Sequence, residues 1–179
     1  MQSIPKSQTE QIRSGDRGVF DRLHADLAPR VRGYLQRLTG GNRAAAEDLT
    51  QDVFVAAYVG RERYSGGARP LGWLMGIARR RWRDSQRSAP PLAAELLPDR
   101  AGDADLAAQV VRAAHLEACL NRLDPAAREA ILLVFGEGRT YAEAAAILAQ
   151  PVGTVKWRVH AASRTLRELL QAAEREELP

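Results

Sequence analysis

The chain has 179 residues, of which 45% are hydrophobic and 27% charged, a balance that is typical of folded proteins and excludes an intrinsically disordered chain. No apolar run is long enough to cross a bilayer, and the single cysteine, Cys119, excludes an intrachain disulfide and a zinc site built from several cysteines. The single cysteine favours a reducing cytoplasm. The net charge is +4 and nearly all of the cations are arginine, which weakly favours a nucleic-acid partner, although such a bias can equally reflect genome composition.

Two helices are predicted before the first glycine pair. A short one covers Thr9 to Arg13, and Asp16 can cap a longer one whose apolar residues recur at helical spacing until Thr39 and Gly40. Pro29 lies inside this pattern and predicts a kink or a break, because proline cannot donate the backbone hydrogen bond that a helix interior needs.

The next predicted helix, residues 44–58, has an acidic side. Glu47, Asp48 and Asp52 lie largely opposite the apolar positions. A metal site is not favoured, because no acids or histidines recur elsewhere at a matching spacing. The acidic side is therefore either a solvated surface, which the spacing favours, or a docking surface for a basic partner.

A polar, glycine-containing loop at residues 61–70 precedes a helix over residues 71–87. Its apolar stripe includes Leu74, Ala78 and Trp82, and five arginines surround Trp82 near the helix end. Arginines with interleaved aromatic residues suit single-stranded nucleic acid, in which bases stack on the rings. Alternatively, the tryptophans belong to the core; the spacing favours this for Trp73 and does not decide it for Trp82.

The periodic pattern lapses from Ser88 to Asp105, a proline-rich stretch that reads as an interdomain linker. A helix resumes at Leu106. Asp124 and Pro125 then start another helix, whose buried side is expected to include Val134 and Phe135.

Residues 138–170 have the pattern of a helix-turn-helix. Thr140 and Glu143 have capping-box spacing, Pro151 and Gly153 interrupt the pattern, and Thr154 can cap the second helix. Several residues lie off the buried stripe of the second helix and could enter a major groove. An ordinary amphipathic helical hairpin would have the same spacing. The residues off the stripe are Lys156, Trp157, Arg158, His160, Arg164 and Arg167.

Four segments in this order resemble bacterial sigma factors of the extracytoplasmic-function (ECF) group. They are AEDLTQDVF (46–54), WLMGIARRRWRDSQR (73–87), LDPAAREAILLVFGEGRTYAEAAAIL (123–148) and PVGTVKWRVH (151–160). The resemblance implies an all-α fold with a sigma region 2 domain at residues 1–88, a flexible linker at 89–105 and a region 4 helix-turn-helix domain at 106–179. It implies a transcription initiation factor with no catalytic residue, metal or cofactor.

The resemblance also implies partners and their binding residues. Region 2 would bind the clamp of the largest catalytic subunit of RNA polymerase, region 4 would bind the flap of the second-largest subunit, and an anti-sigma factor would regulate the protein. Core-polymerase binding is assigned to Asp48, Gln51, Asp52 and Phe54. Binding of melted minus-10 DNA is assigned to Arg63, Trp73, Arg79, Arg80, Trp82, Arg83 and Arg87. Binding of the duplex minus-35 element is assigned to Thr154, Lys156, Trp157, Arg158, His160 and Arg164.

Five residues depart from the family pattern. Arg80 stands where asparagine is common, Ala149 where a turn glycine is usual, and Trp157 where a small polar residue is usual. Ala161 and Ser163 stand where relatives often carry arginine. Two other functions are weighed against a sigma factor. A helix-turn-helix regulator acting alone would bind an operator tightly without polymerase. A nuclease would use Glu47, Asp48 and Asp52 with a metal ion.

Overall fold

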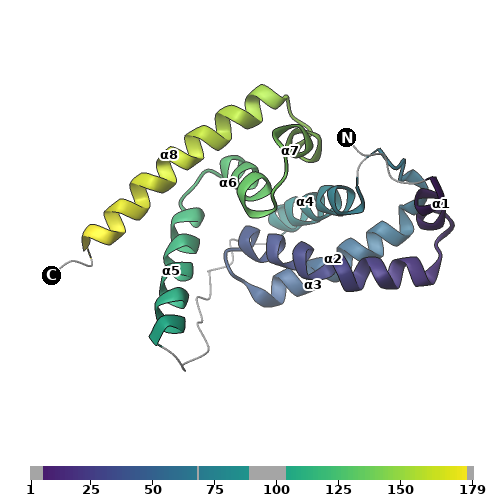
Figure 1. Cartoon of the computed structure of the whole chain (residues 1–179), viewed down its shortest axis with the longest axis horizontal. Helices are drawn as coiled ribbons and strands as arrows, with labels where there is room; N and C mark the ends of the chain where they lie inside the picture. The colour runs from purple at the N-terminus through teal and green to yellow at the C-terminus, as the bar shows by residue number, and fades with distance from the viewer. Residues whose placement is uncertain (1–5, 68, 89–103, 177–179) are drawn as a thin grey trace. The chain divides into compact units, whose positions relative to one another are not determined.

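A computed structural model describes residues 6–67, 69–88 and 104–176, and these residues form helices and turns without any strand (Figure 1). The all-α prediction is therefore confirmed. Helices α1 to α4 belong to one compact unit and helices α5 to α8 to a second. Of the linker predicted over 89–105, residues 89–103 lie outside the described part of the chain.

The N-terminal unit consists of α1 (Lys6–Ser14), α2 (Arg17–Leu38), α3 (Arg43–Val59), the 3₁₀ turn η1 (Arg61–Arg63) and α4 (Pro70–Ser88). Helices α2, α3 and α4 all pack on one another, and α1 packs against η1. The three helices meet because each has one buried apolar stripe, which includes Tyr34 and Leu35 in α2, Val53 in α3, and Leu74 and Met75 in α4.

Helix α2 begins as predicted but does not break at Pro29. The Asp16 carboxylate accepts a hydrogen bond from the Val19 backbone N–H at 2.9 Å, which satisfies a donor of the first turn. The helix then continues through Pro29 to Leu38, so of the predicted kink or break, the break is wrong. Pro29 is exposed, whereas Val31 and Tyr34 beyond it are fully buried, and this burial offsets the missing hydrogen bond.

The C-terminal unit consists of α5 (Ala104–Asn121), α6 (Pro125–Ile131), the π-helical turn η2 (Leu132–Gly136), α7 (Tyr141–Leu148) and α8 (Val152–Glu176). Asp124 caps α6 as predicted, since its carboxylate accepts a hydrogen bond from the Ala127 N–H at 3.0 Å. Helix α8 packs against α5, α6 and α7, and its Val155 and Val159 are buried. The long last helix is thus the common packing partner of this unit.

The π-helical turn changes which residues of the α6 region are buried. The Glu137 N–H donates to the Leu132 carbonyl five residues earlier, at 3.0 Å, so one extra residue is inserted per turn. The expectation that Phe135 is buried is wrong, because its side chain is 68% exposed while Leu132 and Leu133 lie in the core. Periodicity could not show this, because it assumes a constant 3.6 residues per turn.

Within the described residues, no helix has both the length and the hydropathy needed to span a bilayer.

Candidate nucleic-acid and protein interfaces

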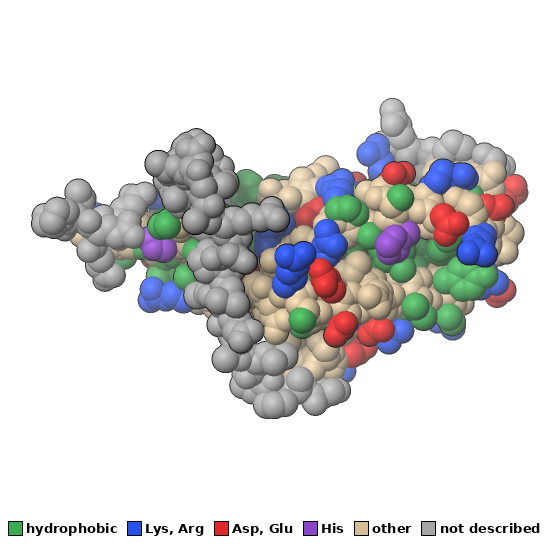
Figure 2. Space-filling view, turned by 90° about the horizontal axis from the view of Figure 1, so that it is seen from below, with side chains coloured by type: hydrophobic (Ala, Val, Ile, Leu, Met, Phe, Trp, Pro, Cys, Tyr) green, Lys and Arg blue, Asp and Glu red, His purple; other side chains and the backbone are tan. Residues whose placement is uncertain are grey.

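One face of α3 is exposed and combines acids with valines. Asp48, Gln51 and Asp52 are exposed, and Val55 and Val59 follow them at the three-, four- and seven-residue spacings that keep side chains on one face of a helix. We call these five residues the docking face. Figure 2 views the N-terminal unit from the side of α2 and α3 and shows acidic, basic and hydrophobic side chains intermingled there.

The two valines were missed by the sequence analysis. Val55 is 63% exposed and Val59 is 74% exposed, although apolar residues of a helix ordinarily pack inward. A helical projection could have found them, because both fall on the acidic side rather than on the buried stripe of Leu49, Val53 and Ala57. The exposed face of α3 therefore combines two carboxylates with two apolar side chains.

The structure separates Phe54 from the other predicted core-polymerase residues. Phe54 is half-buried, and its ring lies edge-on to His24 of α2, with 4.7 Å between the ring centroids. Glu47 is also outside the docking face and lies 3.3 Å from Arg43 in an ion pair one helical turn away. Phe54 therefore contributes to the packing of α3 on α2 in this structure.

The loop after α3 is held against α1 and carries Arg63 at the surface. Gly66 has a φ of 73°, and a Cβ atom at this position would lie 2.5 Å from Thr9 Oγ1, so only glycine permits the close approach. Tyr64 is 2% exposed, and burial raises its pKa to about 12. Its ring packs on Trp73, with 4.8 Å between centroids, so Tyr64 stays neutral and anchors the loop.

Helix α4 divides the predicted minus-10 residues into an exposed and a buried set. Arg80, Arg83 and Arg87 are exposed and share one face at three- and seven-residue spacings. Trp82 and Arg79 are each only 7% exposed, and Trp73 is half-buried against the cluster of Ile12, Val19 and Leu23. Trp82 is therefore not an exposed stacking surface here, because it continues the buried stripe.

The helix-turn-helix prediction is confirmed in its first helix and corrected at the start of its second. The Thr140 hydroxyl accepts from the Glu143 N–H at 3.2 Å, and the Glu143 carboxylate accepts from the Thr140 N–H at 2.9 Å, which forms the capping box. Helix α8, however, starts at Val152, and the Pro151 carbonyl accepts the hydrogen bond of the Val155 N–H. Thr154 is therefore within the first turn and half-buried, not a cap.

The turn itself depends on two residues. Ala149, which stands where a turn glycine is usual in the family, has a φ of 52°, the left-handed conformation that glycine adopts more easily than alanine. Arg158, predicted to contact DNA, is half-buried and donates to the Gln150 side-chain oxygen. Arg158 thus connects α8 to the turn that precedes it.

The exposed face of α8 holds the remaining predicted minus-35 residues. Lys156, Trp157, His160 and Arg164 are exposed, while Val155, Val159 and Ala162 are buried on the opposite side. The Lys156 ammonium lies 5.9 Å from the centroid of the Tyr141 ring, within cation–π range. We call Lys156, Trp157, His160 and Arg164 the recognition face.

Comparison with known proteins connects these surfaces to a family. Sigma-70 region 2 matches residues 23–89 and sigma-70 region 4 matches residues 114–166. The RNA polymerase sigma factor CarQ of Myxococcus xanthus is 36% identical over an alignment of 173 positions, which covers 93% of this chain and 98% of CarQ. The ECF RNA polymerase sigma factor EcfG of Rhodopseudomonas palustris is 32% identical over an alignment that covers 85% of this chain and 87% of EcfG. The chain belongs to the ECF RNA polymerase sigma factors.

Solved sigma factors have the same fold. RpoE from Bartonella quintana, in complex with the anti-sigma factor NepR, superposes with a TM-score of 0.71 at 28% identity and covers 85% of this chain and 96% of its own. CnrH, in complex with the cytosolic domain of CnrY, superposes with a TM-score of 0.70 at 27% identity and covers 92% of this chain and 96% of its own. Sigma factors of this family initiate transcription and are not known as enzymes.

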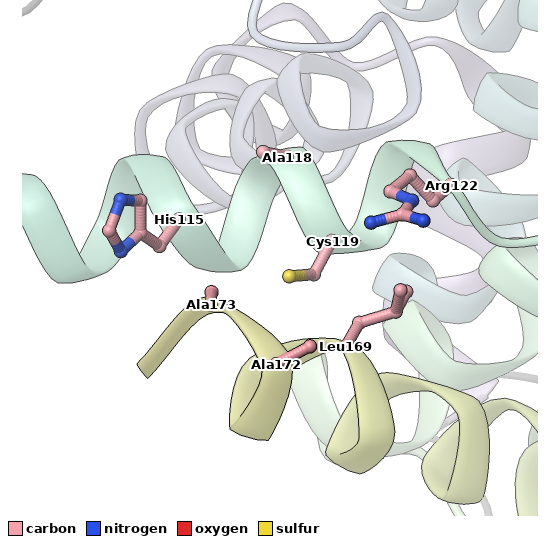
Figure 3. Close-up of a pocket in the computed structure, with 7 residues that line it drawn as sticks. All are labelled: His115, Ala118, Cys119, Arg122, Leu169, Ala172 and Ala173. Atoms are coloured by element: carbon pink, nitrogen blue, oxygen red, sulfur yellow. The ribbon is translucent and has the colours of Figure 1, made fainter. Parts of the chain in front are cut away.

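One small pocket of the sigma factor lies between α5 and α8, and Figure 3 shows its lining. His115 and Cys119 come from α5, Arg122 from the turn that follows it, and Leu169 and Ala172 from α8. The Cys119 side chain is buried, as predicted, and the lining is mainly apolar. No group of three or more metal-ligating side chains occurs in residues 6–67, 69–88 or 104–176 that the structure describes.

Proposed function

We propose that this sigma factor binds core RNA polymerase through the docking face of α3, holds melted minus-10 DNA on the arginine face of α4, and reads the duplex minus-35 element with the recognition face of α8. The observation that carries the proposal is the exposure of these three helix faces, each with a chemistry that suits its partner. The protein would act in the cytoplasm, and polymerase would supply the catalysis.

The docking face suits a basic helix with an apolar stripe, such as a clamp helix of the polymerase. Asp48 and Asp52 would attract its cations, and Val55 and Val59 would be removed from water. Fully burying a valine side chain contributes about 1.5–3 kcal/mol, whereas an exposed ion pair contributes about 1 kcal/mol or less. The valines would therefore supply affinity and the acids would supply orientation and encounter rate.

The arginine face of α4 suits the phosphates of a single strand. Arg80, Arg83 and Arg87 form a cationic track, and Arg63 adds a fourth cation from η1. Replacing one arginine that neutralises a phosphate should reduce the log–log slope of single-strand binding against salt by about 0.7. Trp73 and Tyr64 would position this track by packing α4 and the loop against α1 and α2, rather than by stacking on bases.

The recognition face suits a major groove, which is about 12 Å wide and admits one α-helix. The buried side of α8 fixes the helix against α6 and α7, which leaves the recognition face available to base edges and phosphates. Arg158 would help to set the angle of α8 through its bond to Gln150.

The test is run-off transcription with purified core polymerase on fragmented genomic DNA of the source organism, with and without the protein. Discrete new transcripts are expected, and their aligned upstream sequences would define both promoter elements. Specific duplex binding by the protein alone, without any new transcript, would instead support a stand-alone regulator. Metal-dependent cleavage lost in Asp48→Ala would support a nuclease.

The docking face has a matched control. We expect Val59→Asp and Asp52→Ala to weaken binding to core polymerase, measured by competition with the unaltered protein, and Val59→Asp to have the larger effect. Glu10→Ala removes an exposed acid of α1 and should leave binding unchanged. Equal losses in all three variants would contradict a specific docking face.

We further propose that an anti-sigma factor inhibits the protein by covering the docking face. Support comes from the two similar structures, which are complexes with NepR and with the cytosolic domain of CnrY. A candidate inhibitor should compete with core polymerase, and Val59→Asp should weaken both interactions. An inhibitor that binds the sigma factor and core polymerase together would contradict this mode.

A further inference from the structure

Trp157 is a large apolar side chain that the fold does not use for packing. It is 70% exposed, whereas tryptophan is highly buried on average. Val155 and Val159, two residues before and after it, point to the opposite side of α8 and are at most 1% exposed. Helix α8 is therefore held in place without the indole.

The space around Trp157 is open along the recognition face. Gly153 lies one turn earlier on the same face, and a Cβ atom there would meet no atom within 4 Å. His160 and Arg164 follow Trp157 at three- and seven-residue spacings and are exposed. A DNA duplex that approaches this face would therefore meet the indole without obstruction.

The two cations beside Trp157 in the sequence have contacts within the protein. Lys156 lies over the Tyr141 ring, and Arg158 donates to Gln150 in the turn. These contacts draw the cations toward α7 and the turn, and the indole projects between them. Among residues 156–158, Trp157 therefore presents an exposed apolar surface, and the exposed Arg164 lies on the same face seven residues later.

In the major groove only thymine presents a methyl group, at C5, where cytosine has a hydrogen, and purines present the N7 acceptor. The indole has a single N–H donor and cannot form the bidentate pairs that arginine forms with guanine. We propose that Trp157 packs against a thymine methyl and thereby makes this sigma factor select thymine at one position of its minus-35 element. This inference rests on the proposed binding of the minus-35 element by α8.

The test removes only the methyl group. Full-length protein with core polymerase is bound to a promoter fragment found by run-off transcription, and each minus-35 thymine is replaced in turn by deoxyuridine. At one position the replacement should weaken binding about fourfold, the factor for one buried CH₂-sized group. In Trp157→Ala, thymine and deoxyuridine at that position should bind equally.

Arg164→Ala is the matched control, because it removes a neighbouring exposed side chain of the same face. It should weaken binding to both DNAs and preserve their fourfold ratio. A scan in which no position responds, or a ratio that persists in Trp157→Ala, would overturn the proposal. Loss of core-polymerase binding by Trp157→Ala in the absence of DNA would also overturn it, by making Trp157 a protein contact.

A second measurement separates failure of this inference from failure of the proposed function. If no transcript appears, the same scan is made on duplexes that the full chain alone selects from a random library. A methyl-dependent position there would support thymine reading without sigma activity, whereas a flat scan would overturn it.

Discussion

Trp82 of α4 and Trp157 of α8 both stand between cationic residues, yet their environments are opposite. Trp82 is 7% exposed and Trp157 is 70% exposed. Trp82 follows buried Leu74 and Ala78 by eight and four residues, so it continues their stripe, whereas Trp157 lies two residues from each of two buried valines. Flanking charges therefore do not determine whether an aromatic side chain is buried. Its position on the helix relative to the buried stripe does.

The difference separates the two nucleic-acid surfaces by chemistry. In the N-terminal unit, Tyr64, Trp73 and Trp82 pack inward, and arginines remain at the surface, which suits phosphates of any sequence. In the C-terminal unit, an indole remains at the surface, which suits one kind of base edge. The comparison predicts that substituting Trp157 changes the selection of DNA sequence, whereas substituting Trp82 changes the stability of the N-terminal unit.

The largest expected effect is on stability. Trp82→Ala removes a buried ring and should lower the free energy of unfolding of the N-terminal unit by about 3–5 kcal/mol. Trp157→Ala should change stability by less than about 0.5 kcal/mol, as for other surface substitutions. Urea unfolding with hydrogen exchange of α4 and α8 amides measures both, and equal effects of the two substitutions would contradict the comparison.

The buried aromatic packing of the N-terminal unit predicts a loss of stability at high pH. Burial raises the pKa of Tyr64 to about 12 from its ordinary value near 10, so the unfolded chain loses this proton first. Stability from this group is complete below pH 10 and is lost as the pH rises toward 12, by at most about 2.7 kcal/mol at 1.36 kcal/mol per pKa unit. Unfolding measured against pH should show this decrease in the wild-type protein and a smaller one in Tyr64→Phe.

The C-terminal unit is expected to depend on its helix cap. Thr140→Ala removes the hydroxyl of the capping box and should cost about 1 kcal/mol, seen as faster hydrogen exchange of the α7 amides. Thr165→Ala, an exposed position inside α8, is the control and should be neutral or slightly stabilising because alanine favours helix interiors. A control that costs as much as Thr140→Ala would show that the cap contributes nothing specific.

The smallest expected effect is a gain. Ala149→Gly relieves a left-handed backbone conformation and should stabilise the turn by about 0.5–1 kcal/mol, after part of the gain is offset by the greater freedom of glycine in the unfolded chain. Ala146→Gly, in the middle of α7 and exposed, should instead destabilise by about 1 kcal/mol. Thermal unfolding that shows both substitutions with the same sign would contradict strain at Ala149.

Local features of the fold could be predicted because their causes lie within a few residues. The caps at Asp16, Asp124 and Thr140 each join a side chain to a backbone N–H three residues later, and all three are present. The buried stripe of Leu74 and Ala78 in α4 also follows from spacing, which by itself did not decide whether Trp82 joins it. The predicted break at Pro29 and the predicted burial of Phe135 fail where tertiary burial or a change of helical pitch overrides the local pattern, and Thr154 is not a cap because α8 starts two residues earlier, at Val152.

Most residues of the candidate surfaces were predicted from the sequence, but which of their side chains are exposed together on one face was not. Asp48, Gln51 and Asp52 were predicted with Phe54, yet the structure directs Phe54 toward His24 and adds Val55 and Val59 to the exposed face. Arg158 was predicted with the DNA-binding residues, yet it reaches back to Gln150. The roles of these residues at polymerase and promoter stay predictions.

The sequence by itself determined the family, the all-α fold, the helix starts that depend on caps, and the presence of an acidic helix, an arginine-rich helix and a helix-turn-helix. These properties follow from residue order and from interactions between near neighbours. Only the tertiary structure decided which side of each helix remains exposed. Packing α3 on α2, α4 on the N-terminal core, and α8 on α6 and α7 buries one face of each helix, and the residues left outside are those available to a partner.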